Sequence, residues 1–391
     1  MKTAFSVLSI CAGLLMAPPL FAQITIPNAD GSDGQLVVSN GTAIINLANA
    51  GTGSWLNPSA SPGNGTYDPT NWAVVFKYTN VVIGANATLV FSNHPTHAPV
   101  VWLVNGNVTI NGNLNLDGKT PNTDPNNLTE PGPGGFRGGG SPTYGDGPGF
   151  GPGGGVNGSI TPATYFGTYG NAAIIPLIGG SGGGGMNSYN GGGGGGAILI
   201  AATQTITLNG GYIHADGSVA YAGGSGGAVR LVANQILGSG TIEAICLAAA
   251  NFQGRIRLEG NTVSTSITNN PITPAVVPAN PAIIFPTTNA IVTVVSVGGV
   301  NAPSDPRAGV SSGTPGDDVA LYSASQVTVI VQTQNFPITG TVNVYFKPRN
   351  NGAATITPAT YVSGNFNSAL WSVHATFPAP AHMVVQARAV F

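Results

Sequence analysis

The sequence predicts an all-β protein: a parallel β-helix interrupted by a long glycine-rich insertion and followed by a small β-sandwich of immunoglobulin-like shape. Helical periodicities are almost missing, while short alternating runs rich in Val, Ile and Thr recur between Asn-Gly and Asp-Gly turns. One strand-turn-strand phrase also repeats along the chain. The 391 residues suffice for two or three folded units.

The composition excludes several classes of function. Only 6% of the residues are charged, with 11 Lys and Arg against 13 Asp and Glu. Neither a basic surface for nucleic acid nor an acidic solvating tail is therefore expected. Hydrophobic residues make up 42% of the chain, which is enough for packed cores and argues against disorder.

Residues 1–22 are predicted to be a cleaved secretory signal. Lys2 precedes an apolar run from Ala4 to Met16, and Ala22 ends the segment. That run is too short to span a bilayer, and no later stretch has 18 uninterrupted apolar residues, so no transmembrane segment is expected. Removal of the signal leaves Cys246 as the only cysteine, so no intrachain disulfide is predicted.

Residues 23–270 are predicted to form the β-helix domain. Its first coils and its cap are expected from β runs at 42–48, 72–84 and 87–92. The repeated phrase follows in four copies: VWLVNGNVTINGNLNLDG from Val101, ILIAATQTITLNGGYIHADG from Ile198, VRLVANQILGSGTIEAICL from Val229 and IRLEGNTVSTSI from Ile256. Successive copies start 97, 31 and 27 residues apart. A unit of three short strands of about this length is what one coil of a parallel β-helix requires.

Alternation within the opening strand of each copy predicts which side chains form the interior. The inward set is Val101, Leu103, Ile198, Ile200, Val229, Leu231, Ile256 and Leu258, and the outward set is Trp102, Leu199, Arg230 and Arg257. Stacked coils would bury a continuous aliphatic column that one coil could not bury alone.

The insertion at 132–196 holds 28 glycines among its 65 residues. Free loops are one interpretation, because ordering glycine costs much conformational entropy. Aromatic residues are interleaved with the glycines, at 136, 144, 150, 165, 166, 169 and 189. We therefore expect loops that lie partly on the flank of the β-helix.

The C-terminal third has a different texture. A proline-rich stretch at 271–286 is predicted to be a stiff linker. Residues 287–391 contain about seven alternating strands, which predicts a β-sandwich domain of immunoglobulin-like shape, although no Cys-Trp-Cys signature is present.

The phrases NGNVTINGNLNLDG, GGGGGGAILIAATQTITLNGGYIHADG and GGSGGAVRLVANQILGSGTIEA carry a resemblance over residues 30–265. They resemble uncharacterised secreted bacterial glycine-rich parallel β-helix proteins, usually described as surface or adhesin-like. This resemblance implies the fold and an extracellular location. It supplies no catalytic motif that can be carried over to this chain.

One candidate catalytic ladder emerges from aligning the copies. Asn115, His214 and Glu243 fall at one outward position of the third strand, on coils about 4.8 Å apart. Asp117 and Asp216 occupy matching Asp-Gly turns beside them, and Arg230 stacks on Arg257 in the opening strand. β-Helix polysaccharide lyases and hydrolases use such ladders for acid and base catalysis. The competing interpretation is structural: Asp forms turns, and Arg230 pairs with Glu243 or Glu259.

Metal and ligand sites have weaker patterns. His94 and His97 lack the further ligands that a metal site needs. Asp30 and Asp33 are the best calcium fragment, although the complete D-x-D-x-D-G motif is absent. Trp102, if exposed, would stack on sugar rings or on an insertion loop.

Cys246 lies on an alternating strand and is expected to be a buried, inert thiol. No cofactor is predicted.

Three functions remain open. We expect a secreted structural or adhesive protein of the cell surface or matrix, without catalysis, that self-associates, with filaments as one form, or contacts glycans. The alternatives are a polysaccharide-binding module that uses Trp102 and a polysaccharide-cleaving enzyme that uses the ladder.

Overall fold

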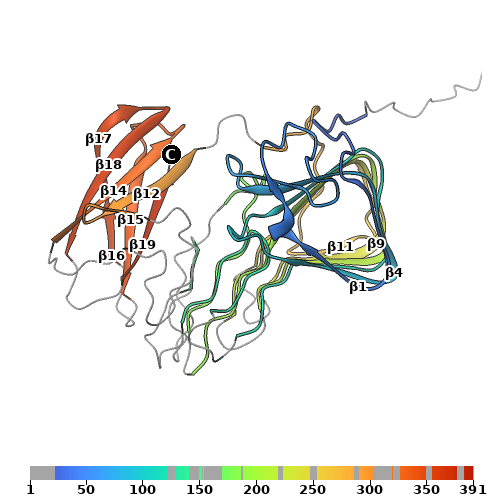
Figure 1. Ribbon diagram of the computed structural model, residues 1–391, viewed down its shortest axis with the longest axis horizontal. Coiled ribbons are helices and arrows are strands. Elements are labelled where there is room, and N and C mark those ends of the chain that lie inside the picture. The colour runs from blue at the N-terminus through green and yellow to red at the C-terminus, as the bar shows by residue number, and fades with distance from the viewer. Residues whose placement is uncertain are drawn as a thin grey trace, which may run out of the picture.

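The computed structural model is built almost entirely of β-strands in two units (Figure 1). It describes residues 23–121, 123, 128–140, 149–151, 153, 170–185, 188–218, 223–246, 253–285, 290–302, 319, 326–348, 355–376 and 383–390. The predicted signal at 1–22 lies outside these residues. Among the helices of the described residues, none has the length and apolarity needed to cross a membrane.

In the described residues, the first unit contains eleven strands in one sheet and one short 3-10 helix. The strands are β1 (Gly34–Asn46), β2 (Gly51–Thr52), β3 (Thr66–Asp68), β4 (Ala73–Ser92), β5 (Val100–Val104), β6 (Val108–Ile110), β7 (Asn113–Asn115), β8 (Ala197–His214), β9 (Ala228–Glu243), β10 (Arg255–Val263) and β11 (Thr268–Asn270), and the helix η1 spans Leu47–Asn49. Apart from the antiparallel contact of β3 with β4, all pairings in this sheet are parallel.

Long strands of this unit lie one on another as successive layers. β5, β6 and β7 each pair with β4 on one side and β8 on the other, and β9 pairs with β8 and β10. Ile198 is opposite Val229, and Val229 is opposite Ile256. All three side chains belong to one buried core, around which the sheet wraps (Figure 1). The predicted aliphatic column is therefore confirmed for β8, β9 and β10.

The register predicted for the first copy was wrong by one residue. Ile198 pairs with Val100 rather than with Val101, so Val100, Trp102 and Val104 face the main core. Trp102 was predicted to point outward, yet it is fully buried against Tyr78. The run of five apolar residues in β5 is buried on both faces, so it lacks the alternation that would set the register.

A second apolar cluster explains why both faces of β5 are buried. Val101 and Leu103, predicted to face the interior, lie in this cluster on the outer side of the sheet, together with Leu199. It is covered by the chain that precedes β1 and by part of the stretch predicted as a linker, through Ile24, Ile26, Ala282 and Ile284. The backbone N–H of Ala282 also donates to Thr25 C=O at 2.9 Å. The described part of the proline-rich stretch thus packs on the first unit.

The glycine run 191–196 is the centre of a bundle of extended segments. Backbone N–H groups three residues apart donate to the same neighbouring segment: Gly191 to Gly139 (2.8 Å) and Gly194 to Phe136 (3.0 Å), Gly193 to Lys119 (3.2 Å) and Gly196 to Leu116 (2.8 Å). A period of three residues per turn is that of a polyproline II helix. Such a helix has no internal hydrogen bonds, so its backbone groups bond to other segments. Because each residue faces a different neighbour in turn, the run is enclosed on three sides.

This enclosure explains why every position of the run is glycine. A Cβ placed on any residue from 191 to 196 would lie closer than 3.0 Å to atoms of an adjacent segment, and at Gly194 that atom is the carbonyl oxygen of Gly180. The described part of the insertion therefore packs against the segments that leave the ends of the layers. Hydrogen bonds between glycine backbones hold the described segments together, and among the described aromatic residues Phe136 is buried beside Trp72 while Tyr189 is half exposed. The aromatic residues at 144, 165, 166 and 169 lie outside the described residues.

The second unit consists of two antiparallel sheets that share one core. The five-stranded sheet contains β12 (Ile291–Val297), β13 (Val300–Asn301), β14 (Gln326–Gln334), β17 (Thr360–Asn365) and β18 (Ser368–Thr376), and the three-stranded sheet contains β15 (Thr341–Pro348), β16 (Thr355–Pro358) and β19 (Met383–Val390). Val329 and Val344 come from opposite sheets and are fully buried together. The arrangement is sandwich-like, in agreement with the alternating pattern of the sequence.

Candidate functional site

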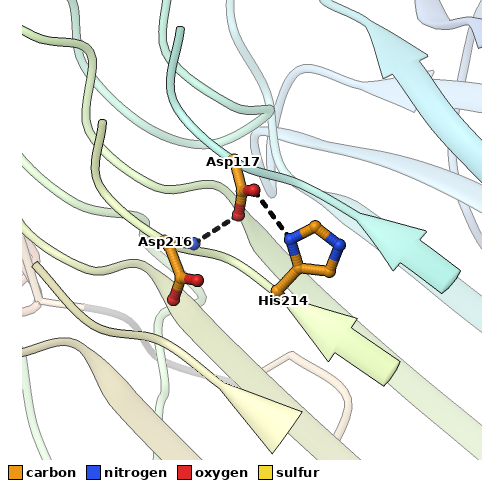
Figure 2. Close-up of side chains that lie close together, drawn as sticks. All are labelled: Asp117, His214 and Asp216. Carbon is orange, nitrogen blue, oxygen red and sulfur yellow. Dashed lines mark hydrogen bonds and ion pairs between the residues drawn. The ribbon is translucent and has the colours of Figure 1, made fainter. Parts of the chain in front are cut away.

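The polar ladder lies where the layers leave the sheet for the glycine bundle. We use this name for Asn115, Asp117, Tyr212, His214, Asp216 and Glu243. The predicted alignment is confirmed, because Asn115 is opposite His214 and His214 is opposite Glu243. Figure 2 shows that Asp117 and His214, from neighbouring layers, point toward each other.

The carboxylates of the polar ladder are occupied by donors from the next layer. Asp117 accepts from His214 Nδ1 at 2.7 Å through Oδ2 and from the backbone N–H of Asp216 at 2.7 Å through Oδ1. Asp216 in turn accepts from the backbone N–H of Ile245 at 2.8 Å. Asn115 accepts from the N–H of Asp117 at 2.8 Å. Each side chain thus fastens one layer to the next or closes its own turn.

Tyr212 and Glu243 complete the polar ladder. The Tyr212 hydroxyl donates to Glu243 Oε2, and the Tyr212 ring stacks on the His214 ring with centroids 4.6 Å apart. Sequence alignment missed Tyr212, although its position two residues before His214 on the same strand face was a usable signal.

The electrostatics of the polar ladder follow from partial burial of several acids. Burial, together with the charges of Asp117 and Glu243, raises the pKa of Asp216 to about 7. Burial and the hydrogen bond to Glu243 raise the pKa of Tyr212 above its ordinary value. Asp216 therefore lies beside two other carboxyl groups, an arrangement that also occurs in the paired carboxylates of hydrolases.

Access decides what this arrangement can do. Asp216 is 3% exposed, so the group with the raised pKa does not face a surface where a polysaccharide would bind. Asp117, His214 and Asp216 offer three potential ligand atoms within 4.8 Å of one another, which is enough ligands to hold a metal ion. Both Asp117 oxygens are already bound, however, and the Asp216 carboxylate points away from His214 (Figure 2). The contacts fit a structural ladder better than a metal centre.

Arg230 and Arg257 share one carboxylate. Their Nε atoms lie 2.7 Å and 2.8 Å from Glu259 Oε1, and the side chains of Arg230 and Glu259 are 3% and 5% exposed. Arg230 was predicted to point outward, but insertion residues and the proline-rich stretch cover this side of the sheet. The pairing with Glu259 confirms one of the two structural partners that the sequence suggested. A buried pair of this kind is costly to break and offers no free group for catalysis.

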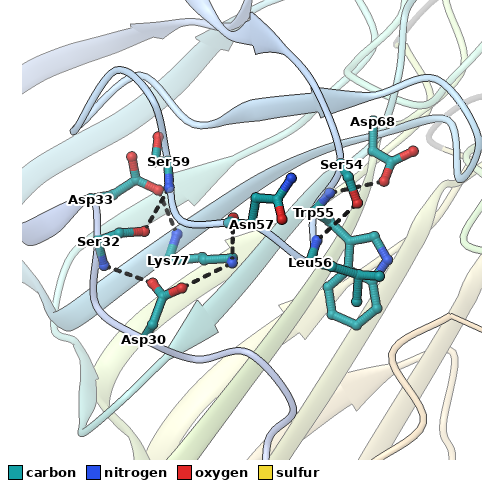
Figure 3. A network of polar contacts seen from close by, with 10 residues as sticks. All are labelled: Asp30, Ser32, Asp33, Ser54, Trp55, Leu56, Asn57, Ser59, Asp68 and Lys77. Atoms are coloured by element: carbon teal, nitrogen blue, oxygen red, sulfur yellow. Dashed lines mark hydrogen bonds and ion pairs between the residues drawn. The ribbon is translucent and has the colours of Figure 1, made fainter.

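Asp30 and Asp33 hold the start of the chain on the sheet (Figure 3). Asp30 Oδ2 lies 3.0 Å from the Lys77 ammonium, which also donates to the C=O of Asn57 at 2.7 Å. Asp33 accepts from the backbone N–H groups of Gly63 and Lys77, at 2.9 Å and 2.7 Å. The cation beside Asp30 is therefore a lysine of this chain, and these contacts favour a structural role for both aspartates.

A third polar cluster surrounds Glu130. Its carboxylate lies 2.8 Å from His97 Nε2 and 2.5 Å from Arg137 Nη2. Burial raises the pKa of Glu130, but the hydrogen bond from His97 and the charge of Arg137 outweigh it and lower the pKa to about 2. His94 instead bonds to Thr96 Oγ1 at 2.9 Å, so the two histidines do not converge. Glu130 was missed because it is 33 residues from His97.

Two further candidates are settled by burial. Trp102 is enclosed in the main core, so it offers no platform for a sugar ring. Cys246 is buried, as predicted for an inert thiol. Comparison of the chain with models of known families, with curated proteins and with solved structures finds no match.

Proposed function

We propose that this chain is a secreted structural or adhesive protein of the cell surface or matrix, without catalysis. Its stacked layers are, in this proposal, coils of a parallel β-helix that acts as a stiff body, and the terminal unit is an immunoglobulin-like sandwich. The expected partners are other copies of the chain or surface glycans, and no cofactor takes part. The secretory signal at 1–22 gives the proposed location.

One observation carries the proposal: every Asp and Glu that the structure describes is engaged by donors of the protein itself. These residues are Asp30, Asp33, Asp68, Asp117, Glu130, Asp216, Glu243 and Glu259. An acid or base catalyst must reach its substrate with a free oxygen in the open. The described carboxylates join layers, as Asp117 and Glu259 do, or close local turns, as Asp68 does, which is expected of a scaffold.

Outward amide rows favour glycan contact as the second candidate. Asn107 donates to Gln204 at 3.0 Å and Asn261 donates to Asn234 at 2.8 Å, in each case between side chains of adjacent layers. Such rows present repeated donors and acceptors at the spacing of the layers. Polysaccharide cleavage at the polar ladder is the less favoured alternative, because Asp216 is buried.

The test compares the secreted chain with a His214→Ala/Glu243→Ala variant on a panel of neutral and acidic polysaccharides. We expect neither protein to release reducing or unsaturated sugars, in an assay carried out once circular dichroism shows that the variant folds. Sugar release by the unaltered chain that disappears in the variant would replace the scaffold proposal with catalysis.

Glycan contact is measured separately, by binding of the same polysaccharides to the immobilised chain. Asn107→Ala/Gln204→Ala is expected to weaken any saturable binding, and Trp102→Phe is the control that leaves the surface unchanged.

A further inference from the structure

The two ends of the layered unit differ, and β1 forms the open end. Among the described residues β1 pairs only with β4, so half of its backbone groups face away from the sheet. Its sequence, GQLVVSNGTAIIN, contains no proline and no charged residue. Proline and charged residues are the features with which other edge strands prevent pairing with another chain, and β1 lacks both.

The core is also incomplete at this end. Leu36, Ala43 and Ile45 face the main core but are only partly buried. Their partners one layer further in, such as Val81 opposite Leu36, are fully buried. The inward side chains of β1 therefore expose an apolar surface that another layer would cover.

The opposite end is closed by the chain itself. Beyond β10, Val276 forms a bridge to Glu259, with its N–H donating to Leu258 C=O at 2.9 Å and its C=O accepting from Gly260 N–H at 3.0 Å. This covering stretch contains Pro271, Pro274, Pro278 and Pro281. Prolines lack the N–H that an added strand needs, so this end does not extend the stack.

β1 matches a second copy of itself. It bends at the corner near Gly41, which has a φ of 67°, and its register with β4 shifts just before this corner, between Val38 and Asn40. Consider a two-fold axis through this corner. It places the half of β1 before the bend antiparallel to the half of the partner's β1 after the bend. Two residues then lie opposite each other when their numbers add up to 81. Side chains that face the core then pair with each other, Leu36 with Ile45 and Val38 with Ala43. The outward side chains of Val37 and Ile44 also pair with each other.

That match extends to the backbone. Along a strand the direction of the side chain and the direction of the N–H and C=O groups alternate together, so residues that face the same way offer their backbone on the same edge. Val37 and Ile44 are 52% and 64% exposed, which is unusual for adjacent outward aliphatic residues in a strand without charges. In a two-fold dimer, Val37 of each copy would form a cross-strand pair with Ile44 of the other copy, so the pair would occur twice.

We propose that two copies of this chain join through β1 in a closed, two-fold end-to-end dimer. The dimer continues both sheets by antiparallel pairing and covers the apolar ends of both cores. It deepens the self-association part of the proposed function and favours a closed dimer over open filaments, because the proline-rich stretch lies over β10 at the other end of each copy. The occupant is a second copy rather than an unrelated strand because the two halves of β1 complement each other.

The first test measures the mass of the secreted chain, with its native N-terminus, by light scattering and sedimentation over a hundredfold range of concentration. We expect a dimer that does not grow further. Val37→Lys and Ile44→Lys place charges on the edge and are expected to halve the mass while the circular dichroism spectrum stays the same. Val277→Lys, an exposed change at the closed end, is the matched control and is expected to remain dimeric.

The second test fixes the register. A Val37→Cys protein mixed with an Ile44→Cys protein is expected to form a disulfide-linked dimer, whereas neither protein alone cross-links across this pair. A monomer at all concentrations, a series of longer oligomers, or cross-linking by each single variant alone would overturn the two-fold dimer. None of these results bears on the polysaccharide assays, so the failure of one proposal is separable from the failure of the other.

Discussion

The aliphatic layers and the glycine bundle of the first unit show two opposite ways of packing a chain. The run 191–196 continues directly into β8, so the change occurs between Gly196 and Ala197. Before that point the segments touch through backbone atoms, and the N–H groups of Gly191 and of residues 193–196 donate to other segments. After it, side chains such as Ile198 and Ile200 fill the core that the sheet encloses.

This difference teaches which kind of change each region tolerates. The layers are stabilised by buried apolar area, so they are weakened when atoms are removed. The glycine run 191–196 has no side chains to remove and no room between its backbone and the adjacent segments, so it is weakened when atoms are added. Predictions that add or remove a few atoms in each region therefore separate the two forms of packing.

The largest effect is expected from adding one carbon to the glycine bundle. In Gly194→Ala the new Cβ collides with the carbonyl oxygen of Gly180, and backbone cannot move aside as a flexible side chain would. We expect a loss of more than about 4 kcal/mol in the free energy of unfolding, or failure to fold. Chemical denaturation measures it.

Gly51→Ala is the control for this prediction. A Cβ at Gly51 has no atom within 4 Å, and the residue does not have positive φ. Its stability should stay within about 0.5 kcal/mol of the unaltered chain. Equal stability of the Gly194 and Gly51 variants would contradict the close packing of the bundle.

The next effect comes from removing atoms from the layers. Ile200→Ala deletes part of a fully buried side chain opposite Leu231 and should cost about 2–5 kcal/mol, because the rigid layers above and below limit collapse into the cavity. Leu56→Ala, at an exposed position, is the control and should be nearly neutral. Thermal unfolding of both variants gives the comparison, and a cost below about 1 kcal/mol for Ile200→Ala would argue against a tightly packed column.

A third effect lies between the two regions, at the polar ladder, and depends on pH. The pKa of Asp216 is raised to about 7 from an ordinary value of 3.8, so the folded state binds this proton more tightly than the unfolded state does. Its contribution to stability is therefore greatest below pH 4 and falls as the pH rises toward 7, at up to about 1.4 kcal/mol per unit.

Asp216→Asn removes this titration and keeps an oxygen for the Ile245 N–H. We expect the variant to exceed the unaltered chain in stability by a few kcal/mol at pH 8 and to match it near pH 4. Urea denaturation at the two pH values measures the difference. A variant that is less stable at pH 8 would mean that the charge of Asp216 is needed, and catalysis or ion binding would regain support.

Some of the candidate site could be predicted from the sequence. The alignment of Asn115, His214 and Glu243 is confirmed because each residue holds the same position in a repeated phrase. Parallel strands that stack in register place equivalent positions opposite each other. Trp102 was misplaced because β5 is apolar at every residue, so nothing in it marks the face toward the main core. Glu130 and Lys77 were missed because their partners come from distant segments.

The sequence alone determined the all-β character, the phase of the layers from Ile198 onward and the scarcity of charge, because these follow from alternation, repeat spacing and composition. Only the tertiary structure decided what covers each face. A strand pattern records which residues alternate, but whether an outward residue meets water or another segment depends on chain that returns from far away. For that reason Leu199 and Arg230 are buried, Val37 and Ile44 are exposed, and the glycine run is enclosed.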